Sequence, residues 1–249
     1  MEKENKLSFC VYGRQALFSD PVTRVGGEKM SYSVPTYEAL KGICESIYWK
    51  PTFVWVVDRV RVMNRIRTQS RGQRVGKFQS DENDLSIYTY LADVRYQVEA
   101  HFEWNENRPE LACDRNENKH FFIAKRMLER GGRRDIFLGT RECQGYVEPC
   151  VFGEGEGAYD RDSASGEDNI LSFGIMLHGI SYPDETGLDY MQTRLCDVIM
   201  KNGVIDFIRP EECRIWTRTA KGSKKIFGEG NFTGLGEFEE EGIFFELDQ

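Results

Sequence analysis

Residues 88–104 read YTYLADVRYQVEAHFEW, and their alternation of apolar and polar side chains is the clearest structural signal in the chain. The apolar members are Val94, Tyr96, Val98, Ala100, Phe102 and Trp104. The polar members between them are Asp93, Arg95, Gln97, Glu99, His101 and Glu103. Because successive side chains of a strand point to opposite faces, this stretch predicts a long strand with one buried face.

The segments on either side of this strand predict two helices and three further strands. LSFCVYG (7–13) is typical of a short first strand, and residues 52–68 and 135–147 are expected to form the others. One helix is expected to start at Pro35 and to stop at Pro51. Its apolar face is Leu40, Ile43, Cys44, Ile47 and Tyr48. The other is expected over 116–130, capped by Gly131-Gly132.

The resulting order is β-α-β-β-α-β, which predicts an α+β protein with a ferredoxin-like domain of the kind found in RRM proteins. We assign residues 1–148 to this domain. Short strands between Gly, Pro and Asp turns predict a smaller antiparallel β-sheet domain over 149–218. Residues 219–249 are an acidic C-terminal extension. It is interpreted as a disordered end, a contact for partner subunits or a competitor for an RNA groove.

Composition indicates a cytoplasmic protein. The chain has 249 residues, 40% of them hydrophobic and 30% charged. No signal peptide is visible, and the longest apolar run, FVWVV, is far below the ~20 residues that span a bilayer. The seven cysteines are scattered without a CxxC pair, so reduced, buried thiols are expected. No membrane partner is expected.

The net charge of −8 hides two basic regions. The last 21 residues hold seven acids and no Lys or Arg. Residues 41–77 hold nine cations against two acids, and residues 115–141 hold eight cations against three acids. Local patches rather than the overall charge decide what a surface attracts, so a polyanion is a candidate partner.

Arginines alternate with apolar residues in the strand expected over 52–68. Arg59, Arg61, Arg65 and Arg67 are predicted on one face, opposite Val60, Val62 and Ile66. A solvated surface is the alternative interpretation. A row of four arginines without an interspersed acid favours contacts with RNA phosphates.

The sequence lacks the complete motifs of phosphate loops, metal sites and serine nucleophiles. FGEGEGAYD (152–160) has the glycine spacing of a phosphate loop, but its glutamates would repel a phosphate and no helix follows. No HExxH motif, EF-hand loop or paired His/Cys set suggests a metal, and no GxSxG suggests a serine nucleophile. Neither a metal nor another cofactor is expected.

RNENKHFF (115–122) is the remaining candidate, because it places Lys119 and His120 at a helix start, where the dipole disfavours cations. Histidine can exchange protons near neutral pH, lysine can stabilise developing phosphorane charge, and RNA supplies a 2′-hydroxyl nucleophile. Metal-independent RNA cleavage is therefore a hypothesis. A histidine at a helix start also often caps or packs, and the apolar stripe makes Tyr48 a core candidate.

Four long segments resemble one family over about residues 7–217. They are VYGRQALFSDPVTRVGGEKMSYSVPTYEALKGICESIYWKP (11–51), HFEWNENRPELACDRNENKHFFIAKR (101–126), ERGGRRDIFLGTRECQGYVEPCVFGEGEG (129–157) and MKNGVIDFIRPEEC (200–213). The family is the CRISPR-associated type I-C endoribonucleases (the Cas five family, d subtype, of the RAMP superfamily).

This resemblance implies a nuclease that cuts the repeat hairpin of precursor CRISPR RNA without a metal, leaving 5′-hydroxyl and 2′,3′-cyclic phosphate ends. It implies that the protein then stays on the crRNA 5′ handle, beside the backbone and large subunits of the type I-C interference complex. The catalytic positions of the family fall on Tyr48, Lys119 and His120, and which of Tyr48 and His120 is the base is open.

A non-catalytic subunit that binds the crRNA handle is the alternative, and the sequence also leaves duplex DNA open as a ligand. The RNA-binding residues predicted beside the catalytic set are Arg59, Arg61, Arg65, Arg67, Arg133, Arg134 and Arg141.

Overall fold

Strand β5 (Asn83–Trp104) organises the sheet, as the alternating pattern predicts. It pairs antiparallel with β1 (Leu7–Ala16) on one side. On the other side it pairs antiparallel with β3 (Phe53–Val62) and then with β4 (Thr68–Gly76). The apolar positions Val94, Tyr96, Val98, Ala100 and Phe102 are all buried. Burial of this face agrees with the predicted alternation, but Gln97, Glu99 and His101 on the opposite face are also buried, so the expectation of only one buried face is wrong over this part of the strand.

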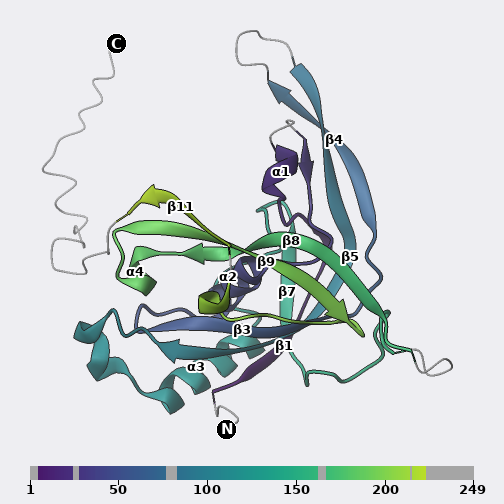
Figure 1. Cartoon of the computed structure of the whole chain (residues 1–249). Coiled ribbons are helices and arrows are strands. Elements are labelled where there is room, and N and C mark those ends of the chain that lie inside the picture. Colours follow the sequence, from purple (N-terminus) through teal and green to yellow (C-terminus); the bar gives the residue numbers. More distant parts are fainter. Residues whose placement is uncertain (1–4, 25–27, 77–82, 162–166, 214, 223–249) are drawn as a thin grey trace, which may run out of the picture.

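The computed structural model describes residues 5–24, 28–76, 83–161, 167–213 and 215–222. It is a mixed α/β structure with a mostly antiparallel sheet and few helices (Figure 1). The remaining strands are β2 (Lys29–Met30), β6 (Ile136–Phe137), β7 (Gln144–Pro149), β8 (Ile170–Ser181), β9 (Tyr190–Lys201), β10 (Val204–Asp206) and β11 (Ile215–Lys221). The helices are α1 (Pro21–Arg24), α2 (Tyr37–Ile47), α3 (Glu117–Glu129) and α4 (Pro183–Thr186), with 3-10 helices η1 (Pro109–Asp114) and η2 (Pro210–Glu212).

The sheet runs in the order β11-β9-β10-β3-β5-β1-β7-β6, with β8 paired to β9. It bends, so that α2 lies between β3 and the β8-β9 pair, whereas α3 packs against β7 and β1 (Figure 1). Fully buried side chains such as Phe9, Leu40, Ile47 and Trp55 fill the space between the helices and the sheet. The paired β4 and β5 extend beyond the body as a long hairpin.

The ends of both long helices follow from their capping residues. The Thr36 hydroxyl accepts a bond from the Ala39 N–H and caps α2, so Pro35 precedes the cap rather than opening the helix. Asn116 caps α3 in the same way, and Gly131 and Gly132 end it with φ of 85° and 109°. The predicted bounds of α3 are confirmed to within a residue.

Two expectations about the strands are wrong. The strand expected over 52–68 ends at Val62, so Arg65 and Arg67 lie in a loop before β4 and not in one row with Arg59. This loop is tied to β5 by bonds from Met63 N–H to the Arg95 carbonyl and from Ala92 N–H to the Arg67 carbonyl. The strand expected over 135–147 is likewise divided into β6 and β7.

Residues 223–249, most of the acidic extension, lie outside the described part of the chain. Within the described part, no helix is long and apolar enough to cross a bilayer.

Candidate functional site

Tyr48 and His120 come together between the two long helices, although 72 residues separate them in the chain. The Tyr48 hydroxyl lies 2.9 Å from Nδ1 of His120. Tyr48 is the residue at which α2 ends, in extended backbone, and His120 lies in the first turn of α3. The His120 ring packs edge-on against Phe53 and Trp104, with ring centroids 5.3 Å and 5.8 Å away. Two of the three predicted catalytic residues therefore meet.

The second nitrogen of His120 fixes the tautomer of the neutral ring. Nε2 lies 2.7 Å from the backbone carbonyl oxygen of Asp114, which can only accept a hydrogen bond. Nε2 must therefore carry the proton, and in the neutral ring Nδ1 accepts the hydrogen bond from the Tyr48 hydroxyl. The pair is arranged for transfer of the Tyr48 proton to His120.

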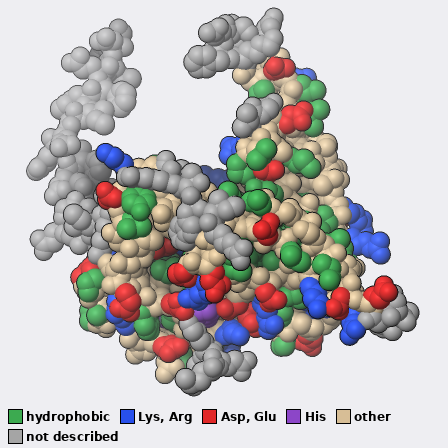
Figure 2. Space-filling view, viewed as in Figure 1, with side chains coloured by type: hydrophobic (Ala, Val, Ile, Leu, Met, Phe, Trp, Pro, Cys, Tyr) green, Lys and Arg blue, Asp and Glu red, His purple; other side chains and the backbone are tan. Residues whose placement is uncertain are grey.

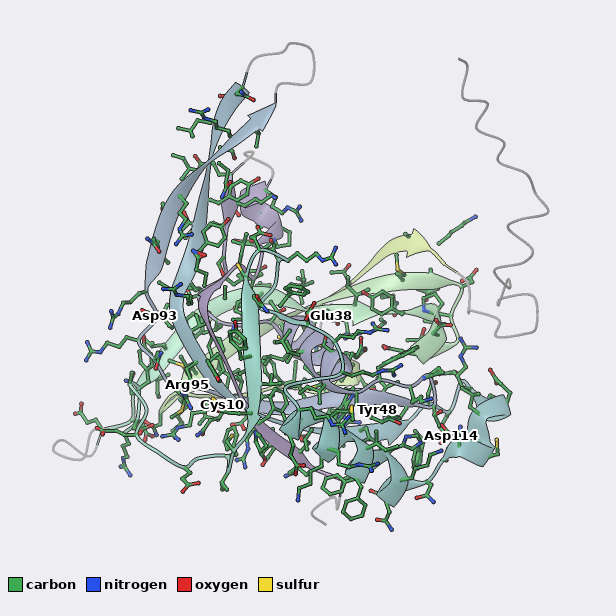
Figure 3. All side chains as sticks on the ribbon, turned by 180° about the vertical axis from the view of Figure 1, so that it is seen from behind. Cys10, Glu38, Tyr48, Asp93, Arg95 and Asp114 are labelled. Atoms are coloured by element: carbon green, nitrogen blue, oxygen red, sulfur yellow. The ribbon has the colours of Figure 1, made fainter. Side chains whose placement is uncertain are left out.

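Asp114, at the end of η1, joins Lys119 to this pair. Figure 3 shows Asp114 and Tyr48 on the same side of the molecule. Its Oδ1 accepts a bond of 2.5 Å from Lys119 Nζ, and its Oδ2 accepts a bond of 3.0 Å from the Thr52 hydroxyl. The hydrogen bond from Lys119 is the largest of the effects that lower the pKa of the Asp114 carboxyl. Sequence reasoning did not single out Asp114, although it lies six residues before His120 within RPELACDRNENKH.

Arg133 lies close enough to influence Tyr48. Its N–H donates to the carbonyls of Ser46 and Ile47, which holds the loop after α3 against the end of α2. Burial, and then the Asp114 charge, raise the pKa of the Tyr48 hydroxyl, and the Arg133 charge lowers it. Arg133 was predicted from sequence as an RNA contact, and the structure places it beside the candidate catalytic pair.

The three predicted catalytic residues differ in their exposure to solvent. His120 is 0% exposed and Tyr48 is 3% exposed, whereas half of the Lys119 side chain is accessible. A ligand at the surface can therefore meet Lys119 directly. It cannot reach the two rings unless some of the groups that cover them move.

The other predicted RNA contacts fall into different environments. The Arg61 guanidinium is buried and bonds to both oxygens of Asp160 and to the carbonyls of Glu154 and Gly155. Arg59 pairs with Glu99 and covers the Phe152 ring. Arg65, Arg67, Arg133, Arg134 and Arg141 are exposed.

Comparison with known proteins places these features in a family. The family model described as a CRISPR-associated protein of the Cas5d type matches residues 7–208. A CRISPR pre-crRNA endoribonuclease Cas5d from Mannheimia succiniciproducens is 26% identical over 232 residues, covering 81% of this chain and 94% of that protein. The same enzyme from Thermus thermophilus is 29% identical over 191 residues, covering 73% of this chain and 76% of that protein.

Two solved structures are also similar. A crystal structure described as a CRISPR-associated protein has a TM-score of 0.70 and 38% identity, covering 85% of this chain and 96% of that one. A functionally uncharacterized protein from Streptococcus mutans has a TM-score of 0.69 and 38% identity over the same shares.

Proposed function

This chain belongs to the Cas5d family of CRISPR-associated proteins, and we propose that it cleaves the repeat hairpin of precursor CRISPR RNA without a metal ion. The observation that carries the proposal is the 2.9 Å contact between the Tyr48 hydroxyl and His120 Nδ1, with Lys119 beside it. The curated relatives that carry the name pre-crRNA endoribonuclease support the same substrate.

The reaction uses the 2′-hydroxyl next to the scissile phosphate as nucleophile. Tyr48 Oη takes the proton of that hydroxyl while its own proton passes to His120 Nδ1, so His120 is the final base. The 2′-oxygen bonds to phosphorus and the bond to the 5′ oxygen breaks, which gives a 2′,3′-cyclic phosphate. The 5′ oxygen takes a proton from solvent and becomes a hydroxyl.

Charge on the pentacoordinate phosphorus is stabilised by two cations. Lys119 is half exposed and can turn its ammonium group from Asp114 to a phosphate oxygen. Arg133, whose charge already acts on Tyr48, is the second cation. Since both rings are closed from solvent, the proposal requires RNA binding to open a path to the Tyr48 hydroxyl.

A second function is favoured by that same burial. A histidine with 0% exposure and both nitrogens hydrogen-bonded is also what a purely structural residue would show. In that case the protein binds the crRNA 5′ handle without cutting it.

The proposal also includes a ferredoxin-like unit, a smaller second domain and a place in the type I-C complex. Strands β7-β1-β5-β3, with α2 and α3, form the ferredoxin-like unit, and their antiparallel order supports this assignment. The unit ends near residue 148, and the strands after it form the smaller domain. After cleavage the protein stays on the 5′ handle, beside the backbone and large subunits of the type I-C complex.

Cleavage of a repeat hairpin in EDTA tests the proposal. The wild-type chain should cut, Lys119→Ala and His120→Gln should slow cutting by about 10²–10⁴-fold, and Lys221→Ala should not. A 2′-deoxy nucleotide at the scissile position should abolish cutting and preserve binding. Cutting of the 2′-deoxy RNA would exclude the 2′-hydroxyl mechanism, and binding without any cutting by the wild type would favour the second function.

A further inference from the structure

A groove of about 710 Å³ lies on the outer face of the sheet, away from the helices and from the candidate catalytic pair. Figure 3 shows Asp93 and Arg95, two of its lining residues, on the opposite side of the molecule from Tyr48 and Asp114. Its volume is within the ~300–1,000 Å³ of ligand pockets. The groove is therefore large enough for a nucleotide and separate from the site already described.

The lining of the groove combines arginines with two tyrosines: Tyr12, Arg14, Arg65, Arg67, Arg95 and Tyr146. Among the described residues, no carboxylate lies within ion-pair distance of Arg14, Arg65 or Arg67. Figure 2 shows Lys and Arg side chains standing out where the β4–β5 hairpin joins the body. Arg14, Arg65 and Arg67 therefore have no carboxylate partner within the described residues, whereas Arg95 is paired with Glu148 and Asp93 is an acidic member of the lining.

Tyr12 and Tyr146 supply the aromatic surface. They lie on paired strands β1 and β7, with ring centroids 5.9 Å apart and planes inclined by 34°. Arg95 covers the Tyr12 ring at 5.3 Å and is held by Glu148 at 2.8 Å, while Tyr146 is 54% exposed. An exposed ring beside arginines is the arrangement on which single-stranded nucleic acid stacks its bases.

The wall that carries Arg65 and Arg67 is preformed. Asp93 has a φ of 49°, and its carbonyl accepts a 2.7 Å bond from the Asn64 side chain. The Ile66 N–H donates to the Tyr159 hydroxyl, and the Ala158 N–H donates to the Met63 carbonyl. These bonds hold the arginine loop in place before any ligand arrives, which reduces the entropy lost on binding.

We propose that this groove binds unpaired RNA nucleotides, with a base stacked on Tyr146 and the neighbouring phosphates at Arg14, Arg65 and Arg67. This inference rests on the proposed function, because it takes the unpaired segment next to the repeat hairpin as the ligand. The interior of an RNA duplex does not satisfy the site, since bases stacked on both sides cannot present a face to the tyrosine ring.

The test compares two RNAs on the full chain: a 2′-deoxy-blocked repeat hairpin with an unpaired extension, and the same hairpin without it. Fluorescence anisotropy measures Kd at several salt concentrations. Tyr146→Ala should weaken binding of the extended RNA by about 5- to 100-fold, and Tyr146→Phe by less than about twofold, because the ring provides the stacking. Both variants should bind the hairpin without the unpaired extension as tightly as the wild type does.

The charge arm uses Arg65→Gln with Arg67→Gln, and Lys221→Gln on β11 as a matched control. The double variant should flatten the slope of log K against log salt by about 0.7 per lost contact, on the extended RNA only. Equal losses on both RNAs, or no loss with Tyr146→Ala, would overturn the proposal. Fluorescence anisotropy measures binding and does not require cutting, so this test can be carried out even if the protein never cleaves RNA. If the protein cleaves normally but the groove variants bind the extended RNA as the wild type does, only the groove proposal is refuted.

Discussion

Replacing Arg61 with glutamine should destabilise the fold rather than weaken RNA binding. The guanidinium has 7% side-chain exposure and bonds to Asp160, Glu154, Gly155 and Gln97, which together fix the segment that covers the outer face of β5. Breaking a fully buried ion pair costs about 3–5 kcal/mol. Asp160 is 36% exposed, and water can partly replace its partner, so we expect about 2–3 kcal/mol.

This loss should depend on pH in a defined direction. Burial is the largest single effect on the Asp160 carboxyl and raises its pKa. The hydrogen bonds from Arg61 and from the Gly157 N–H, together with the Arg61 charge, lower the pKa by more than burial raises it, so the pKa lies below its ordinary value. A lowered pKa stabilises the fold above the unfolded value of ~3.9, and this stability is lost as the pH falls through the folded value. The difference between wild type and Arg61→Gln should therefore be full at pH 6–8 and shrink below about pH 4.

Thermal and urea unfolding measure this difference. Arg61→Gln should lower Tm by roughly 4–12 °C at pH 7. Arg59→Gln should cost about 1 kcal/mol or less, because Arg59 is 40% exposed and its buried partner Glu99 keeps Lys6 as a second cation. At a temperature where wild type and Arg61→Gln are both folded, RNA binding by Arg61→Gln should depend on salt as binding by the wild type does. An Arg61→Gln protein with unchanged Tm and a flatter salt slope would refute this reasoning.

Three further changes follow from the structure. Asp114→Asn should lower the pKa of Tyr48 and Arg133→Gln should raise it, because the first removes a negative charge and the second a positive charge near the phenol. The apparent pKa in the pH–rate profile of cleavage should therefore fall in Asp114→Asn and rise in Arg133→Gln. A shift in the same direction in both variants would contradict the assignment of Tyr48 to proton transfer. Asp114→Asn should also cost about 1 kcal/mol in urea unfolding at pH 7, because its partner Lys119 is half exposed. Gly139→Ala should prevent stable folding, since φ is 92° and a Cβ would lie 2.0 Å from a backbone oxygen; a Tm close to the wild type would contradict that geometry.

Local patterns predicted the elements that depend on local chemistry. The alternation around Val98 gave the central strand, and the Asn116 and Gly131 signals gave α3 almost to the residue. The strand expected over 52–68 was wrong because its end at Val62 depends on pairing with β5, which lies far away in sequence. The β3–β5 pairing stops at Val62–Tyr96, and β4 pairs with β5 only from Thr68–Leu91.

Three residues of the candidate site were named from the sequence, but their contacts were not. The family resemblance named Tyr48, Lys119 and His120, but nothing in the sequence says that Tyr48 ends its helix and points to His120. Asp114 was overlooked because its role requires both a side-chain bond to Lys119 and a carbonyl bond to His120. Alternation placed Arg61 outside, and only the covering segment with Asp160 explains its burial.

A double-mutant cycle on the candidate catalytic pair, Tyr48 and His120, tests the central claim most directly. Single-turnover cleavage of the repeat hairpin in EDTA is measured for wild type, Tyr48→Phe, His120→Gln and the double variant, all confirmed to be folded. If the two side chains act as one proton relay, each single change slows cleavage by about 10²–10⁴-fold and the double variant is no slower than the slower single variant. Cleavage unaffected by both changes, or losses that multiply in the double variant, would contradict the relay.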